Sequence, residues 1–167
     1  MKAMVVYDSV FGNTKQVALA IGQALAEQGR ADTSPVTEID AEKIRAYDLL
    51  IVGSPTRGFR PTEAIAKFLK SLAKGDLKGR QVAAFDTRIL LSTIDSSALR
   101  FIVNTGGYAA PNIAKTLKGK GGILLMPPEG FYVTGEQGPL QDGELRRAED
   151  WARQIVAKGR LGNETSV

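Results

Sequence analysis

The most constraining stretch of this sequence is its beginning, where a short apolar run leads through a turn into a helical pattern. Residues 4–7 are apolar and partly β-branched, which predicts a buried strand. Residues 8–14 read Asp-Ser-Val-Phe-Gly-Asn-Thr, and apolar positions at helical spacing continue to about residue 28. The first N–H groups of a helix have no internal partners, so such a turn forms an anion-binding cradle. Because residues 8–14 contain no Lys or Arg, we expect the cradle to hold a phosphate by neutral hydrogen bonds, with Ser9 and Thr14 as hydroxyl donors and Gly12 allowing close approach.

Strands and helices are expected to alternate along the rest of the chain, and Asn13 or Thr14 is expected to cap the first helix. Further strands are predicted at 31–38, 48–53, 81–85 and 121–126, with a possible extension of the last at 131–133. Further helices are predicted at 62–72, 109–118 and 143–158. This alternation predicts a single-domain α/β fold, a doubly wound five-stranded parallel sheet of strand order 2-1-3-4-5. The domain is expected to span residues 1–158, followed by a frayed tail at 159–167.

The composition excludes several kinds of chemistry. The 167 residues include no Cys and no His, which removes disulfides, thiol chemistry and the commonest metal ligand. Any redox chemistry must therefore come from a bound organic cofactor, and no metal site is expected. The net charge of +4 comes without a Lys/Arg-rich block, so nucleic acid is not an expected partner. No apolar run reaches the length of a membrane span and no signal-peptide pattern opens the sequence, so we expect a cytoplasmic protein without a membrane span.

Three loops are expected to meet where ligands bind in this topology, at the carboxyl ends of the strands. They comprise residues 8–14, 53–61 and 86–90. The sequence contains no G-x-G-x-x-G, so a dinucleotide-binding fingerprint is not indicated. It contains no G-x-x-x-x-G-K-[ST] either, so the P-loop of nucleoside triphosphatases is not indicated. A phospho-receiver domain is also excluded, because Gly53-Ser54 and Met126-Pro127 stand where its aspartate and lysine belong.

The first loop, Ser9-Val10-Phe11-Gly12-Asn13-Thr14, resembles the [ST]-x-x-G-N-T phosphate loop of flavodoxins, and the strand order extends this resemblance over nearly the whole chain. The resemblance implies FMN as the cofactor, with its 5′-phosphate held by Ser9, Val10, Phe11, Gly12, Asn13 and Thr14. It further implies that two other loops flank the flavin ring. These would contribute Pro55, Thr56, Arg57, Gly58 and Phe59 from the second loop, and Asp86, Thr87 and Arg88 from the third.

The second loop departs from electron-transfer flavodoxins, which commonly place an aromatic residue where Arg57 stands. Residues 53–57 instead resemble the Pro-Thr-Arg loop of flavodoxin-like quinone reductases, although residues 86–89 do not resemble that family's third loop. The first interpretation is an FMN-binding electron-transfer protein that serves redox partner proteins. The alternative is an FMN-dependent NAD(P)H:quinone oxidoreductase acting on a small-molecule quinone, and a third interpretation is a flavin-free interaction module.

Two further expectations concern the surroundings of the ring. Arg57, Arg60 and Arg88 predict a basic neighbourhood, which would make the reduction potential less negative than in acidic flavodoxins. Phe11, Phe59 and Ile89 are apolar candidates to cover the ring. Residues 89–107 are apolar for a connection, which suggests a lid, a dimer contact or a docking surface, with core packing as the plain alternative.

Overall fold

The protein is described here by a computed structural model, which covers residues 1–90, 92, 94–98, 100–101 and 107–164. The strands are β1 (Lys2–Tyr7), β2 (Arg30–Pro35), β3 (Leu49–Pro55), β4 (Gln81–Ile89), β5 (Ile123–Leu124) and β6 (Glu129–Val133). The helices are α1 (Asn13–Ala26), α2 (Ala41–Ile44), α3 (Glu63–Ser71), α5 (Ala109–Gly119) and α6 (Glu144–Glu164), and a 3₁₀ turn covers Val36–Glu38.

The sheet has the predicted order, β2-β1-β3-β4-β5, and every pair of neighbouring strands is parallel. Its fifth position is shared by two segments. β5 pairs with the first residues of β4, and β6 pairs with Phe85–Ile89 further along the same strand. Pro127 and Pro128 separate the two segments, and proline cannot donate to a strand ladder. The predicted extension beyond a kink is therefore confirmed.

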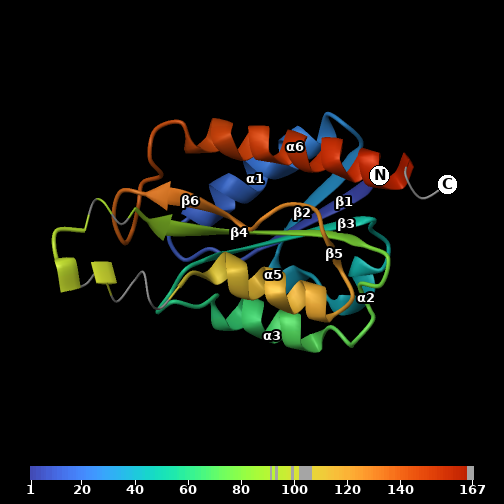
Figure 1. The fold of residues 1–167 in the computed structure, drawn as a ribbon, viewed down its shortest axis with the longest axis horizontal. Helices are drawn as coiled ribbons and strands as arrows, with labels where there is room; N and C mark the ends of the chain where they lie inside the picture. The colour runs from blue at the N-terminus through green and yellow to red at the C-terminus, as the bar shows by residue number, and fades with distance from the viewer. Residues whose placement is uncertain (91, 93, 99, 102–106, 165–167) are drawn as a thin grey trace.

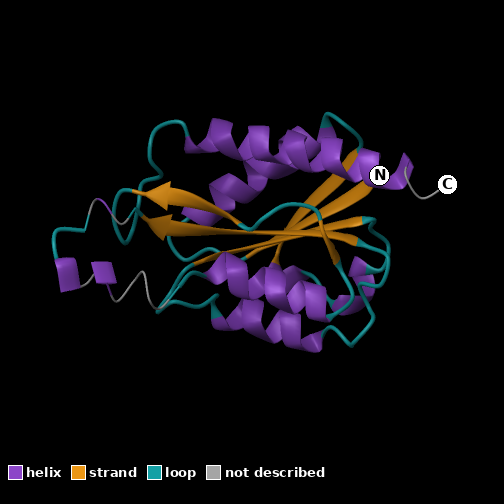
Figure 2. Cartoon of the chain, viewed as in Figure 1, coloured by secondary structure: helices purple, strands orange, loops and turns teal. Residues whose placement is uncertain are grey.

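The helices cover both faces of the sheet, with α1 and α6 on one side and α3 and α5 on the other (Figures 1 and 2). The alternation of side chains along β4 divides the core accordingly. Ala83 and Phe85 pack in the cluster under α1 and α6, whereas Val82 and Ala84 pack in the cluster under α3 and α5. Both termini lie at one end of the sheet, and the carboxyl ends of the strands lie at the other (Figure 1). That second end is where the three loops meet.

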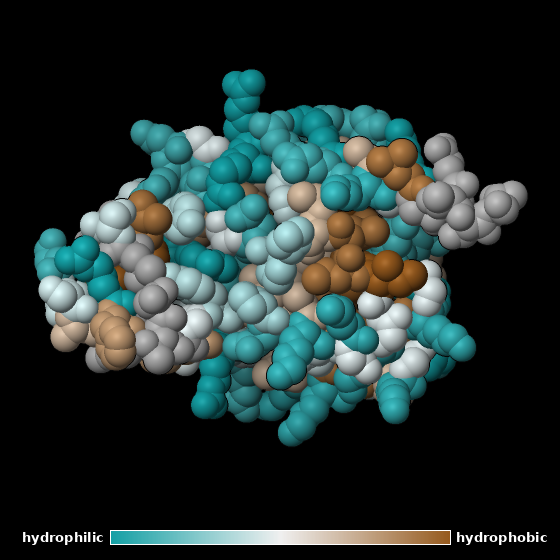
Figure 3. All heavy atoms as spheres, viewed as in Figure 1, coloured by the Kyte–Doolittle hydropathy of each residue, from teal (hydrophilic) through white to brown (hydrophobic). Residues whose placement is uncertain are grey.

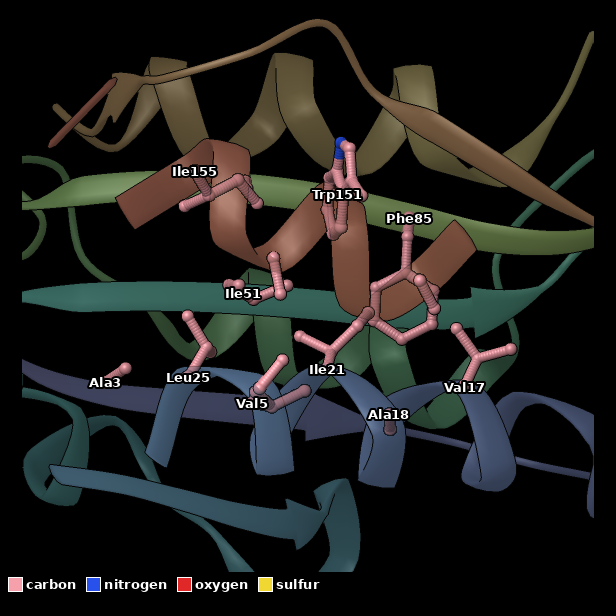
Figure 4. Close-up of a cluster of buried hydrophobic side chains, with 14 of the residues drawn as sticks. Ala3, Val5, Val17, Ala18, Ile21, Leu25, Ile51, Phe85, Trp151 and Ile155 are labelled. Atoms are coloured by element: carbon pink, nitrogen blue, oxygen red, sulfur yellow. The ribbon is translucent and has the colours of Figure 1, made fainter. Parts of the chain in front are cut away.

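The core under α1 and α6 is closely interlocked. Figure 4 shows Val17, Ile21 and Leu25 of α1 directed toward the sheet, with Trp151 of α6 above them. Phe85, Phe131 and Trp151 make mutual edge-to-face contacts, with ring centroids 6.0–6.3 Å apart. A Cβ atom on Gly53 would lie 2.0 Å from the Phe85 ring, so the ring can pack over this position of β3 only because residue 53 is glycine.

β4 is longer than the sequence predicted, because it continues from Phe85 to Ile89. The extra residues find ladder partners on both sides. β6 pairs with them on one side, and the backbone N–H of Thr56 donates to the carbonyl of Thr87 at 2.9 Å on the other. The prediction that residues 86–88 form a loop is therefore wrong, and these residues approach the site from a strand.

Helix ends also differ from the prediction. Gly12 rather than Asn13 or Thr14 is the N-cap of α1, with a left-handed φ of 91°. α6 continues past Lys158 to Glu164, and Gln81 Nε2 donates to the Gly159 carbonyl at 3.0 Å. Residues 159–164 are thus helical rather than frayed, and the rest of the expected tail lies outside the described residues.

The connection at 89–107 is described only in part, because residues 91, 93, 99 and 102–106 lie outside the described chain. Residues 97, 98, 100 and 101 of this connection are helical. The lid, dimer contact and docking surface expected of residues 89–107 stay predictions. Apolar atoms also gather at the β5 edge of the sheet (Figure 3), where Ile123 is exposed. Within the described residues, no helix combines the length and apolar character needed to cross a bilayer.

Candidate functional site

The first loop is organised by one hydroxyl group. Ser9 Oγ accepts hydrogen bonds from the backbone N–H groups of Gly12 at 3.1 Å and Lys15 at 3.2 Å. The backbone N–H of Ser9 donates to Asp8 Oδ1 at 2.9 Å, so the Asp8 carboxylate stabilises the start of the same turn. Ser9 therefore shapes the loop, and its own hydroxyl hydrogen stays available for another acceptor.

The loop leaves several N–H groups without partners. Among the described residues, those of Val10, Phe11, Asn13 and Thr14 donate to no backbone or side-chain acceptor. They lie at the N-terminus of α1, a helix of 14 residues, where the helix dipole favours negative charge. An added Cβ on Gly12 would have no heavy atom within 4 Å, so the backbone is open to an incoming group. This is the geometry of a neutral anion cradle.

The side chains of Asn13 and Thr14 are buried and serve the fold. Asn13 Nδ2 donates to the Gln137 carbonyl at 3.0 Å, and this contact brings the β6–α6 connection to the site. The Thr14 and Thr87 hydroxyls lie 2.8 Å apart, which ties the loop to β4. The expectation that Thr14 acts through its hydroxyl is thus modified, because that hydroxyl has an internal partner.

The second loop is a tight two-residue turn. The backbones of Arg57 and Arg60 exchange two hydrogen bonds of 2.9 and 3.0 Å around Gly58 and Phe59. Both central residues have positive φ, 51° for Gly58 and 67° for Phe59, which matches a type I′ turn. Glycine adopts this conformation freely, whereas a bulky residue such as Phe59 is strained by about 1 to 3 kcal/mol. Phe59 is the one non-glycine residue with positive φ among those described.

The third part of the site is a buried ion pair on β4. Asp86 is fully buried, and Arg88 Nε and Nη2 donate to its two oxygens at 2.5 and 2.8 Å. The backbone N–H of Ala110, at the start of α5, donates to Asp86 at 2.8 Å. The Arg88 guanidinium also lies 3.7 Å from the centroid of the Tyr108 ring. The third site segment is thereby fixed to the N-terminus of α5.

Two opposing influences act on the Asp86 carboxyl. Burial raises its pKa, and the Arg88 guanidinium, the Ala110 N–H and the Thr56 hydroxyl act in the opposite direction. Thr56 also accepts from the Ala109 N–H at 3.0 Å, so the second loop is fastened to the same helix start. Asp86 is therefore an internal support and does not face the cavity.

A cavity of about 260 Å³ lies where the three segments meet. Ten of the fourteen predicted site residues line it: Val10, Phe11, Asn13, Thr14, Pro55, Thr56, Arg57, Gly58, Thr87 and Arg88. Ser9, Gly12, Phe59 and Asp86 do not line it. Ser9 and Gly12 shape the cradle beside the cavity, and Asp86 lies behind Arg88.

Three other residues complete the lining, Ile89, Val133 and Glu136. Sequence reasoning named Ile89 as a cover for the ring but gave no site role to the other two. They come from β6 and the connection after it, and the Asn13–Gln137 hydrogen bond spans 124 positions of the sequence. No local motif signals such a contact.

The charges at the cavity correct the expected basic neighbourhood for Arg88 alone. The charge of Arg88 is compensated by Asp86, and Arg57 Nη1 lies 4.0 Å from Glu136 Oε1 in an exposed pair. Arg60 does not line the cavity. The Arg57–Glu136 pair is long and exposed and offsets little charge, so the expected basic neighbourhood now rests on Arg57 and Arg60. The less negative reduction potential drawn from it stays a prediction. Within the described chain, no group of three acidic, His or Cys side chains could hold a metal ion.

Comparison with known proteins identifies the family and agrees with the fold. A family model described as "Flavodoxin domain" matches residues 4–96, which contain the first, second and third site segments. Oxidised flavodoxin 1 from Bacillus cereus is similar in structure, with a TM-score of 0.74 at 18% identity, over 94% of this chain and 98% of that one. A flavodoxin from the domain Archaea gives a TM-score of 0.72 at 22% identity, over 95% and 98%. Rubredoxin oxygen:oxidoreductase from Desulfovibrio gigas gives 0.71 at 17% identity, and this chain covers 37% of its length.

The chain belongs to the flavodoxin family, since the family model covers more than half of it. Membership of this family implies FMN as the cofactor. The residues present fit such a group, because unpartnered N–H groups at the α1 N-terminus adjoin a cavity with both apolar and polar lining.

Proposed function

We propose that this protein binds FMN at the carboxyl edge of its sheet and transfers electrons between redox partners. The observation that carries the proposal is the set of unpartnered N–H groups of residues 10, 11, 13 and 14, beside the cavity. FMN supplies the electron chemistry, and the protein supplies binding, orientation and electrostatics.

Each site segment has a distinct part in this proposal. The N–H groups of Val10, Phe11, Asn13 and Thr14 hold the phosphate, and Ser9 keeps the loop in shape. The cavity between the second loop and β4 takes the ring, with Arg88 fixed in place by Asp86 and Tyr108. Phosphate binding should require no movement of the first loop, because the hydrogen bonds accepted by Ser9 Oγ already hold the loop in shape.

A second candidate is an FMN-dependent NAD(P)H:quinone oxidoreductase. The observation that favours it is the position of Pro55-Thr56-Arg57, which line the cavity with the Arg57 side chain 46% exposed at its rim. A cation at a cavity mouth suits an anionic substrate such as a nicotinamide nucleotide. The two candidates differ in whether electrons move singly or in pairs.

The experiment that tests the proposal has two stages. Titration of the apoprotein with FMN, followed by the quenching of flavin fluorescence, measures binding, and absence of binding would contradict both candidates. Photoreduction of the loaded protein, followed by visible absorbance, then separates them. Two resolved one-electron stages support the electron-transfer protein. A single two-electron stage, with rapid reduction by NADH or NADPH and turnover of a quinone, supports the reductase.

A further inference from the structure

The second loop places two like charges opposite each other. Arg57 and Arg60 form an antiparallel bridge and exchange both backbone hydrogen bonds. Residues paired in this way project their side chains from the same face, and like charges directly opposite destabilise the pair. The turn also holds Phe59 at a φ of 67°. Two unfavourable features therefore coincide in four residues at the rim of the cavity.

Neither arginine is strongly neutralised. Arg57 meets Glu136 only at 4.0 Å, and both side chains are largely exposed, a geometry that contributes little attraction. Arg60 is exposed and has no carboxylate within 4.0 Å in the described part of the chain. Both guanidinium groups are thus available to an external partner.

Apolar side chains adjoin this charge. Val10 is 50% and Phe11 44% exposed, and the Arg57 guanidinium lies 5.7 Å from the centroid of the Phe11 ring. Aromatic and arginine side chains are the types enriched at the centres of protein interfaces. We call Val10, Phe11, Arg57 and Arg60 the arginine face. Three of its four members also line the cavity.

We propose that the arginine face docks a redox protein whose own docking surface carries clustered carboxylates, an inference that rests on the proposed electron-transfer function. Charge complementarity selects an acidic partner, and the exposed Val10 and Phe11 select a protein surface over a small anion. Nucleic acid is disfavoured because half of the face is apolar. A partner seated there lies at the mouth of the cavity, where the distance for electron transfer is shortest.

The test measures association directly, without electron transfer. The protein, as apoprotein and after addition of FMN, is immobilised, and an acidic plant-type [2Fe–2S] ferredoxin is passed over it at low and high salt. Basic mitochondrial cytochrome c and a DNA duplex serve as comparison probes. The variants are Arg60→Gln and Arg57→Gln/Arg60→Gln. Their matched controls are Lys78→Gln and Lys74→Gln/Lys78→Gln, which remove the same charge from the exposed connection between α3 and β4.

We expect the ferredoxin to bind the unaltered protein at low salt and to weaken steeply as salt rises. The double arginine variant should lose about tenfold in affinity, Arg60→Gln less, and both lysine controls little. If the lysine controls lost as much affinity for the ferredoxin, the effect would be explained by net charge alone, and the proposal would be overturned. Preference for cytochrome c, or tighter binding of the DNA duplex through the same arginines, would overturn it as well.

The FMN titration separates this proposal from the proposed function. Arg60 lies outside the cavity lining, so Arg60→Gln should bind FMN as the unaltered protein does. If FMN binds and the ferredoxin does not, the docking proposal fails and the function stands. If FMN does not bind at all, the function fails, whatever the ferredoxin does.

Discussion

The two sides of the cavity are built in opposite ways. The cradle of residues 8–14 uses neutral backbone N–H groups, one serine hydroxyl and a glycine with positive φ. The opposite wall uses a fully buried carboxylate, a bidentate arginine and the start of another helix. The first depends on backbone shape and the second on charges that compensate each other, so the two sides should respond differently to substitution.

The largest effect is expected on the charged side. Asp86→Ala leaves the Arg88 guanidinium, whose side chain is only 15% exposed, without its partner. We expect a loss of about 3 kcal/mol in the free energy of unfolding, measured by urea denaturation. Asp86→Ala/Arg88→Leu removes both charges and should recover part of that loss. A double variant no more stable than Asp86→Ala would contradict the ion-pair account.

A smaller effect is expected at the glycine of the cradle. Gly12→Ala forces a Cβ-bearing residue to a φ of 91° without a clash, since no heavy atom lies within 4 Å of the new Cβ. We expect about 1 to 2 kcal/mol of destabilisation, together with weaker FMN binding. Gly75→Ala is the matched control, with a φ of 93° and no neighbour within 4 Å at the other end of the sheet. Equal FMN affinity in the two variants would show that the cradle is not the binding element.

The serine of the cradle offers a third comparison. Ser9→Ala removes the acceptor of the Gly12 and Lys15 N–H groups, which should cost about 1 kcal/mol of stability and lower FMN affinity. Ser9→Thr keeps the hydroxyl and should restore both. Thermal unfolding and the FMN titration check the two readouts separately. If Ser9→Ala bound FMN with full affinity, the proposal that this hydroxyl organises the phosphate loop would be wrong.

The smallest effect is expected at the strained turn and has the opposite sign. Phe59→Gly should be about 1 kcal/mol more stable than Phe59→Ala, since glycine adopts the φ of 67° without strain. Comparing two small residues removes the effect of the lost ring. Urea denaturation of the two variants measures the difference. Equal stability would mean that the turn relaxes in solution to another conformation.

The same contrast explains what the sequence could predict. The cradle follows from a contiguous motif, and the strand order follows from the alternation of apolar patterns, so both were predictable. The Asp86 environment was not, because the Ala110 N–H and the Tyr108 ring come from a distant helix start. The placement of residues 86–88 in a strand depends on pairing with β6, which lies about 40 positions further along.

Val133 and Glu136 were missed for a related reason. Val133 is placed by the pairing of β6 with β4, where it lies opposite Ile89. Glu136 lies beside Gln137, whose carbonyl accepts from the Asn13 amide, a side chain whose motif position suggested a phosphate contact. The neutralisation of Arg88 was missed because Asp86 and Arg88 share a face only when both lie in a strand. Local chemistry was therefore predictable, whereas charge balance required the folded structure.

The central claim, that the backbone cradle of residues 10–14 holds a phosphate, is tested most directly by comparing FMN with riboflavin. The two ligands share the flavin ring and differ in the phosphate. Fluorescence titration of the apoprotein should give an affinity for FMN about 100-fold higher or more, because at least two N–H groups bind the charged phosphate. Equal affinities for FMN and riboflavin would mean that the phosphate makes no contact with the cradle, and would contradict the account.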